Sequence, residues 1–166
     1  MVVLVLGIVL VKSIFKSGTN AVNEIDSQVQ DQINKLFADE ATRFVIYPPS
    51  REITIAQGDT GGVGFSIRNI DTGAQKAFKY SVTPAADSDL NSRCGLTPNA
   101  AGKLLILGRE GTYTLNSGNK MDVAALIKFE IPKTTPLCLI RYNIVVTTVA
   151  DGKVYGNTEF DLKIVS

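Results

Sequence analysis

From residue 43 onward, the sequence consists of short stretches in which apolar and polar residues alternate, separated by residues that favour turns. The alternation is clearest where Phe65 and Ile67 alternate with Ser66 and Arg68. Successive side chains of a β-strand point to opposite faces of a sheet, so a period of two predicts strands with one buried and one solvated face. No helical pattern separates these stretches, and the region therefore predicts an all-β domain.

The number and spacing of these stretches are typical of an antiparallel immunoglobulin-like sandwich. Pro48-Pro49-Ser50 interrupts the pattern and predicts an edge strand that switches between the two sheets. Asp151-Gly152 suits a type I′ turn, so the stretches on either side of it are expected to form a hairpin. The expected strands are Arg43–Tyr47, Glu52–Ala56, Val63–Asn69, Phe78–Thr83, Lys103–Leu107, Thr112–Leu115, Val123–Ile131, Leu139–Thr148 and Lys153–Val165.

The chain has two cysteines, Cys94 and Cys138, and no histidine. No third ligand lies near either thiol to complete a zinc site, so a disulfide is expected, and two buried free thiols are the alternative. In the chain-entropy description, a bridge that closes a loop of this length stabilises the fold by about 4 kcal/mol. Residues 85–101 are rich in Ser, Asn, Asp, Pro and Gly, and we expect them to form a long surface loop that the bridge pins to the strand carrying Cys138.

The chain opens with an apolar run from Met1 to Val11, followed by Lys12 and Lys16. As a helix, residues 1–15 would extend about 22 Å, which is less than the bilayer core of about 30 Å. No basic residue precedes the run, as it would in a signal peptide, and lysines after it would favour a cytoplasmic domain, where disulfides are poorly maintained. We therefore expect a secreted chain whose basic leader has been removed and whose apolar run packs against other copies. A plain membrane anchor with a stalk is the alternative.

Apolar residues continue at intervals of three and four as far as Phe37, which is the spacing of one helix face. Polar residues between them, such as Glu24 and Asp31, give the segment a solvated face. We expect one continuous helix from about Val2 to about Ala41, forming a region of residues 1–42 ahead of the sandwich of residues 43–166. The residues expected to pack this helix on the sandwich are Val22, Ile25, Val29, Ile33, Leu36 and Phe37.

The composition argues against catalysis and against nucleic acid as a partner. The chain has 17 Lys and Arg residues against 16 Asp and Glu residues, so its net charge of +1 attracts no polyanion. It contains no His and no Trp, which removes the commonest general base and the commonest metal ligand. No catalytic pair stands out among the remaining residues. We expect neither an enzyme nor a cofactor or metal site.

The segments ITIAQGDTGGVGFSIRNIDTG and FEIPKTTPLCLIRYNIVVTTVADGKVYGNTEFDLKIV resemble the immunoglobulin-like sandwiches of archaeal and bacterial surface proteins. In those domains, an F-x-I-x-N strand follows a glycine-containing turn. An Ile-Pro edge, a tyrosine-bearing strand and an Asp-Gly hairpin then close the sheet, as Ile131-Pro132, Tyr142 and Asp151-Gly152 do here. The resemblance covers most of residues 43–166.

The order of an apolar segment, an amphipathic helix and a β-domain resembles archaeal type IV pilins and archaellins. Position 5 is Val5, and archaeal members generally lack the glutamate that bacterial pilins have there. In this family a leader is cut, the apolar helices bundle as the filament core, and the sandwiches form the outer surface. The same order of elements also fits archaellum stator proteins, which hold one sandwich outside the membrane on a single helix.

The resemblance implies an extracellular, cell-surface filament subunit that resides in the membrane before it assembles into a helical homopolymer. The alternative is a membrane-anchored extracytoplasmic immunoglobulin-like binding module, such as a stator-like protein. A surface ligand or glycan stays open, as does a role in adhesion, motility or DNA uptake. The expected filament-core residues are Val2, Val3, Leu4, Val5, Leu6, Ile8, Val9, Leu10, Val11, Ile14 and Phe15.

Overall fold

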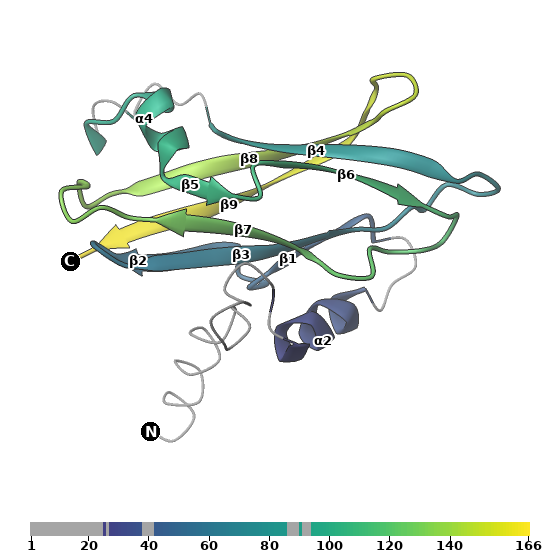
Figure 1. Ribbon diagram of the computed structural model, residues 1–166, viewed down its shortest axis with the longest axis horizontal. Coiled ribbons are helices and arrows are strands. Elements are labelled where there is room, and N and C mark those ends of the chain that lie inside the picture. Colours follow the sequence, from purple (N-terminus) through teal and green to yellow (C-terminus); the bar gives the residue numbers. More distant parts are fainter. Residues whose placement is uncertain (1–24, 26, 38–41, 86–89, 91–93) are drawn as a thin grey trace.

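Two β-sheets stacked face to face form the body of the protein (Figure 1), in a computed structural model that describes residues 25, 27–37, 42–85, 90 and 94–166. The arrangement is an immunoglobulin-like sandwich, which confirms the prediction for the β-domain. The four-stranded sheet has the order β1 (Phe44–Tyr47), β3 (Thr60–Ile67), β7 (Ala125–Glu130) and β5 (Leu105–Leu107). The five-stranded sheet has the order β2 (Glu52–Ala56), β9 (Val154–Val165), β8 (Leu139–Thr148), β4 (Lys76–Pro84) and β6 (Glu110–Leu115).

The chain changes sheets at Pro48-Pro49-Ser50, which confirms the predicted switch. β1 pairs with β3 in one sheet, whereas β2 pairs with β9 in the other. β2 and β9 run parallel, while the other strand pairs of the described chain are antiparallel. The expectation of an antiparallel sandwich therefore needs one correction. β2 reaches the edge of its sheet by crossing from the opposite sheet rather than through a hairpin, so its direction is not forced to oppose that of β9.

Asp151-Gly152 joins β8 and β9, which pair antiparallel along their length, so the predicted hairpin is confirmed. Gly152 has a φ of 68°, in the left-handed region that the turn requires. The Asp151 carboxylate accepts hydrogen bonds from the Thr148 hydroxyl and from the Lys153 amide. These contacts fix the tip of the hairpin.

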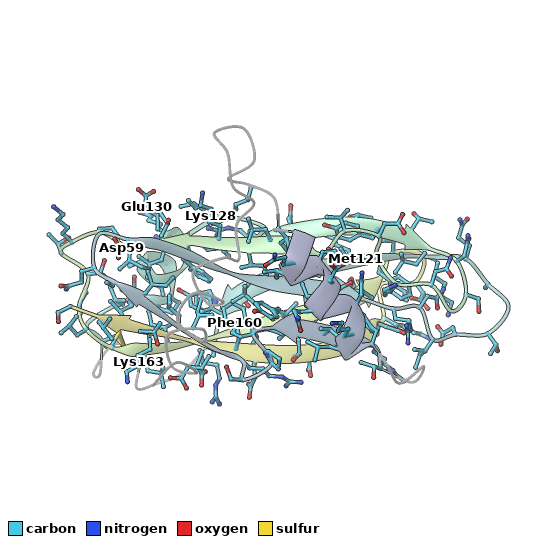
Figure 2. All side chains as sticks on the ribbon, turned by 90° about the horizontal axis from the view of Figure 1, so that it is seen from below. Asp59, Met121, Lys128, Glu130, Phe160 and Lys163 are labelled. Carbon is cyan, nitrogen blue, oxygen red and sulfur yellow. A yellow bond between two sulfur atoms is a disulfide. The ribbon has the colours of Figure 1, made fainter. Side chains whose placement is uncertain are left out.

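Aromatic side chains fill the space between the two sheets. The ring centroid of Phe129, on β7, lies 4.9 Å from that of Tyr142 and 5.8 Å from that of Phe160, both on the opposite sheet. Figure 2 shows Phe160 between the sheets, whereas Glu130 and Lys163 project outward from opposite faces. The rings are tilted or edge-on to one another, which is the geometry that aromatic pairs favour. One continuous core therefore joins the sheets.

The predicted long N-terminal helix is wrong. The helix that precedes β1 is α2 (Ser27–Leu36), which has 10 residues. Ile25 lies in a β-bridge and not in a helix, so α2 does not continue to it. At the other end, the Phe37 amide donates to the Asn34 carbonyl at 3.2 Å, a tighter turn that closes the helix. Residues 1–24 lie outside the described part, and the described residues form mainly a β-sandwich with short helices.

The segment between β4 and β5 is not the surface loop that its composition suggested. It contains α4 (Pro98–Lys103), which Thr97 caps by accepting a hydrogen bond from the Ala100 amide. Leu90, Cys94 and Ala101 are buried in the main core. The segment therefore covers one end of the sandwich. The predicted strand start at Lys103 is wrong for the same reason, because Lys103 belongs to α4 and β5 begins at Leu105.

None of the helices in the described ranges combines the length and the apolar character needed to cross a membrane.

Candidate functional site

The residues expected to form the filament core lie outside the described part of the chain, and so does Val22. The structure therefore gives these side chains no position. The expected filament-core residues are Val2, Val3, Leu4, Val5, Leu6, Ile8, Val9, Leu10, Val11, Ile14 and Phe15.

The remaining residues expected to pack on the sandwich lie at α2. Ile25, Val29, Ile33 and Phe37 are buried on the outer face of the four-stranded sheet (Figure 1). Leu36 is 37% exposed and points away from this contact. The sheet contributes Val45 from β1, Leu126 from β7 and Ala124 from the segment before β7. This cluster is separate from the core between the sheets.

Cys94 and Cys138 form a disulfide, which confirms the predicted bridge. Their Cα atoms lie 5.4 Å apart, and the bridge connects positions separated by 44 residues in sequence. Cys94 is buried, whereas Cys138 is half-buried just before β8. The bridge ties the end-covering segment with α4 to the five-stranded sheet. Disulfides of this kind persist in oxidising compartments rather than in the cytosol.

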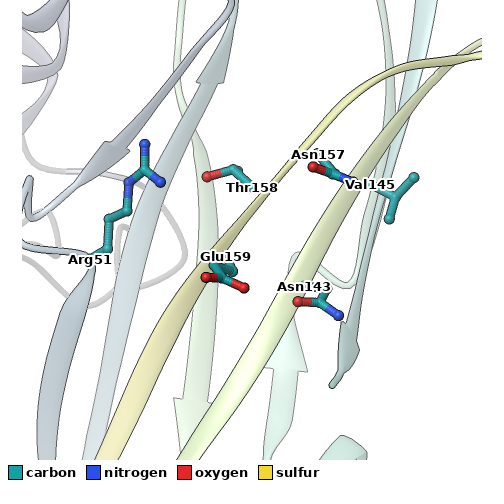
Figure 3. A pocket seen from close by; sticks show the side chains of 6 residues that line it. All are labelled: Arg51, Asn143, Val145, Asn157, Thr158 and Glu159. Carbon is teal, nitrogen blue, oxygen red and sulfur yellow. The ribbon is translucent and has the colours of Figure 1, made fainter. Parts of the chain in front are cut away.

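A polar hollow lies beside β9, next to Arg51 and just before β2 joins the edge of the five-stranded sheet. Its volume is about 390 Å³, within the usual range for small-molecule sites. Figure 3 shows Arg51 on one side, with Asn143, Asn157 and Glu159 on the other. The lining residues are Arg51, Asn143, Val145, Asn157, Thr158 and Glu159.

The register of β8 and β9 brings the floor of the hollow together. Asn143 is paired with Glu159, and Val145 is paired with Asn157, so the four residues form two adjacent rows. Their neighbours Ile144 and Phe160 are buried in the core. Because side chains alternate between the faces of a strand, the four residues lie on the outer face of the five-stranded sheet.

Arg51 is held in a fixed backbone conformation at the rim. Its amide donates to the Pro48 carbonyl at 3.0 Å, and its carbonyl accepts from the Asp161 amide at 2.8 Å. Its φ of 59° lies in the left-handed region, which non-glycine residues occupy at a cost of about 1 kcal/mol or more. The turn after Pro48-Pro49-Ser50 thus orients the Arg51 side chain towards β9.

Several polar groups around the hollow lack partners within the described residues. The Arg51 guanidinium and the side-chain amides of Asn143 and Asn157 make no hydrogen bond or ion pair there. The Thr158 hydroxyl is buried and unpartnered, and Figure 3 shows it on the side that faces Arg51. Glu159 lies 3.6 Å from an Arg141 nitrogen. The hollow therefore offers several free hydrogen-bond donors and acceptors.

Chemically, this arrangement suits binding rather than bond-breaking. Glu159 is the one carboxylate that lines the hollow. No group of three or more His, Cys, Asp or Glu side chains in the described ranges is placed to hold a metal ion. A general acid and base acting together would need two titratable groups within hydrogen-bond reach of one substrate. The sequence prediction missed this hollow, although two asparagines inside strands were a signal, because asparagine is depleted in strands.

No protein-family model matches the sequence, and a comparison with curated proteins found no match. Among solved structures, a PapD-like domain of human CEP192 is 14% identical, with 77% of this chain and 87% of that chain covered and a TM-score of 0.46. A CARDB domain from Pyrococcus furiosus in complex with di-metal ions is 14% identical over 74% of this chain and 87% of that chain, with a TM-score of 0.43.

A family 123 glycoside hydrolase from Clostridium perfringens is 10% identical, with a TM-score of 0.50. The match covers 82% of this chain but 25% of the hydrolase. At this identity the likeness shows the sandwich fold alone.

Proposed function

We propose that the chain is a structural, non-enzymatic subunit of an extracellular filament of the archaeal type IV pilus kind. Residues 1–15 of neighbouring copies pack together, and the sandwiches form the outer surface. The observation that carries this proposal is the apolar run from Met1 to Val11, joined to a sandwich whose two apolar clusters, between the sheets and beneath α2, are already buried.

The described sandwich has little apolar surface against which the apolar run could pack. α2 covers part of the outer face of the four-stranded sheet. The outer face of the five-stranded sheet carries polar residues such as Arg141, Glu159 and Lys163. A long exposed apolar segment marks a contact with another molecule. Identical runs from neighbouring copies supply such a contact and bury one another.

The disulfide supports the same proposal. The Cys94–Cys138 bridge is typical of a protein outside the reducing cytoplasm. A cell-surface filament accounts for this feature.

Deletion of Val2–Val11 tests the proposal. Negative-stain microscopy of the full chain is expected to show fibres, whereas the shortened chain is expected to sediment as a folded monomer. A matched control replaces Lys12 and Lys16 with arginine, which keeps the apolar run and the charge and should preserve the fibres. Fibres formed by the shortened chain, or single particles formed by the full chain, would contradict a filament built on this run.

A membrane-anchored binding module is the second candidate, and the polar hollow beside Arg51 favours it. The unpartnered hydrogen-bonding groups of the hollow could orient a bound ligand, as the few polar groups of binding pockets do. In this case the full chain would be extracted from membranes by detergent as single copies. The same microscopy distinguishes the two candidates.

A further inference from the structure

We propose that the hollow beside Arg51 binds a neutral sugar unit, either free or as part of a glycan. The proposal does not depend on whether the chain forms filaments, because the hollow lies on the outer face of the sandwich.

The hydrogen-bonding capacity of the lining matches that of a sugar. Arg51 presents donors only, Glu159 presents acceptors only, and the Asn143 and Asn157 amides present both. Each hydroxyl of a sugar both donates and accepts. A ligand with several adjacent hydroxyls can therefore satisfy all of these groups, whereas a simple anion satisfies the donors alone.

The charge balance of the hollow also favours a neutral ligand. Arg51 and Glu159 contribute one charge of each sign to the lining. The nearest cation to Glu159 is Arg141, with a nitrogen 3.6 Å away. Arg141 is itself bound to Asp161 at 2.9 Å. The opposing charges leave no strong local field that would select a phosphate or a metal ion.

The hollow has little apolar surface, which favours a sugar over a peptide as its ligand. Val145 is the one hydrophobic side chain that lines it. A peptide bound by its side chains gains most of its affinity from apolar and aromatic anchors, which need apolar pockets. The lining offers no such pocket. A sugar can bind mainly through its hydroxyl groups, with Val145 as the one apolar contact for its ring carbons.

The lining residues are already held in place before a ligand binds. The Arg51 backbone is fixed by hydrogen bonds to Pro48 and Asp161, and the asparagines lie on two paired strands. Groups held in place in this way lose little conformational freedom on binding. The left-handed conformation of Arg51 places its side chain at the rim of the hollow at some cost in backbone strain.

Saturation-transfer difference NMR on the full chain tests the proposal, because it detects ligands of monomers and filaments alike. The probes are glucose, galactose, mannose and N-acetylglucosamine at about 10 mM, a range suited to millimolar affinity. A panel of short peptides serves as the comparison. At least one sugar is expected to give a transfer signal that saturates.

Two variants test whether the sugar binds in the hollow beside Arg51. Arg51→Asn removes the guanidinium but tolerates the left-handed backbone, and Asn143→Ala removes one amide from the floor. Each is expected to weaken sugar binding about tenfold. Thr112→Ala, at an exposed position of β6 on the opposite edge of the same sheet, should bind as the parent chain does.

The proposal is overturned if none of the sugars gives a signal, or if both variants bind a sugar as tightly as the parent chain. Signals from the peptides alone would also overturn it and would assign the hollow to an extended polypeptide. Circular dichroism of the variants establishes that a loss of binding is not a loss of fold.

Discussion

Gly64 on β3 lies directly beneath Ile33 of α2, so close that a methyl group on Gly64 would stand 2.8 Å from the Ile33 Cδ1 atom. The same methyl group would stand 3.2 Å from the Ile25 Cδ1 atom. Both distances are shorter than ordinary contacts between carbon atoms. The missing side chain of Gly64 is therefore what allows α2 to seat on the four-stranded sheet.

Gly64→Val is expected to lower the free energy of unfolding by about 1–3 kcal/mol, because the added carbons force α2 away from the sheet. Ile33→Ala should also be destabilising by itself, by about 2–4 kcal/mol, because it leaves a cavity. In the double variant the space left by Ile33 accommodates the valine. The combined loss should fall short of the sum by about 1 kcal/mol or more.

Urea denaturation followed by circular dichroism measures these changes. Thr112→Val introduces the same valine side chain at an exposed strand position and should change stability by less than about 0.5 kcal/mol. Simple additivity of the Gly64 and Ile33 substitutions would mean that α2 does not rest on Gly64.

Asn69 is expected to be the most sensitive polar residue of the sandwich. Its buried amide donates to the Ala74 and Leu115 carbonyls, both at 3.0 Å, and its side-chain oxygen accepts from the Asp71 amide. Asn69→Ala removes all three hydrogen bonds, including the buried one to the Leu115 carbonyl, and should cost about 2–3 kcal/mol in a thermal or urea melt. Asn119→Ala removes an exposed amide and serves as the control. Equal losses from the two variants would show that the Asn69 contacts do not matter.

The Cys94–Cys138 bridge should contribute a large share of the stability. Replacing both cysteines with alanine is expected to lower the free energy of unfolding by about 4 kcal/mol. A reductant should destabilise the parent chain but leave the double variant unchanged. Mass spectrometry should show a gain of two hydrogens on reduction. A parent chain that melts identically with and without reductant would refute this prediction.

The strands could be predicted because their signals are local. Alternation placed β2 and β8 at the residues where the structure has them, and Pro48-Pro49-Ser50 marked the change of sheet. The helix was wrong for a physical reason. Intervals of three and four show which residues would share a face, but not whether the chain stays helical between them. Ile25 and Ile33 do share the buried cluster, although Ile25 lies in a β-bridge.

The hollow could not be predicted, because it depends on contacts distant in sequence. The register of β8 and β9 places Glu159 opposite Asn143. Arg51 lies near them because the chain crosses between the two sheets just before it. The left-handed conformation of Arg51 has no signature in the sequence, since arginine rarely adopts it. The asparagines inside strands mark an unusual polar surface, but they do not show that it forms a hollow.

The buried tyrosines should make the protein unstable in alkali. Burial raises the pKa of Tyr80, Tyr113, Tyr142 and Tyr155 above the usual value of 10.0. As the pH rises above about 10, these phenols ionise in the unfolded chain but keep their protons in the folded one. The folded state then binds more protons, so the free energy of unfolding falls as the pH rises towards the folded-state pKa values. Below about pH 10 this contribution is fully present.

Urea denaturation at several pH values between about 8 and 12 tests this dependence. Tyr80 and Tyr142, the two most deeply buried of these phenols, each add up to about 1.4 kcal/mol of lost stability per pH unit in their titration range. Tyr142→Phe removes one of them together with the hydrogen bond from its hydroxyl to the Ala101 carbonyl at 2.8 Å. This variant should therefore be less stable at pH 8 but lose stability less steeply in alkali, whereas Thr112→Val should keep the parent slope. A Tyr142→Phe slope equal to that of the parent would mean that this phenol ionises as easily in the folded chain as in the unfolded one.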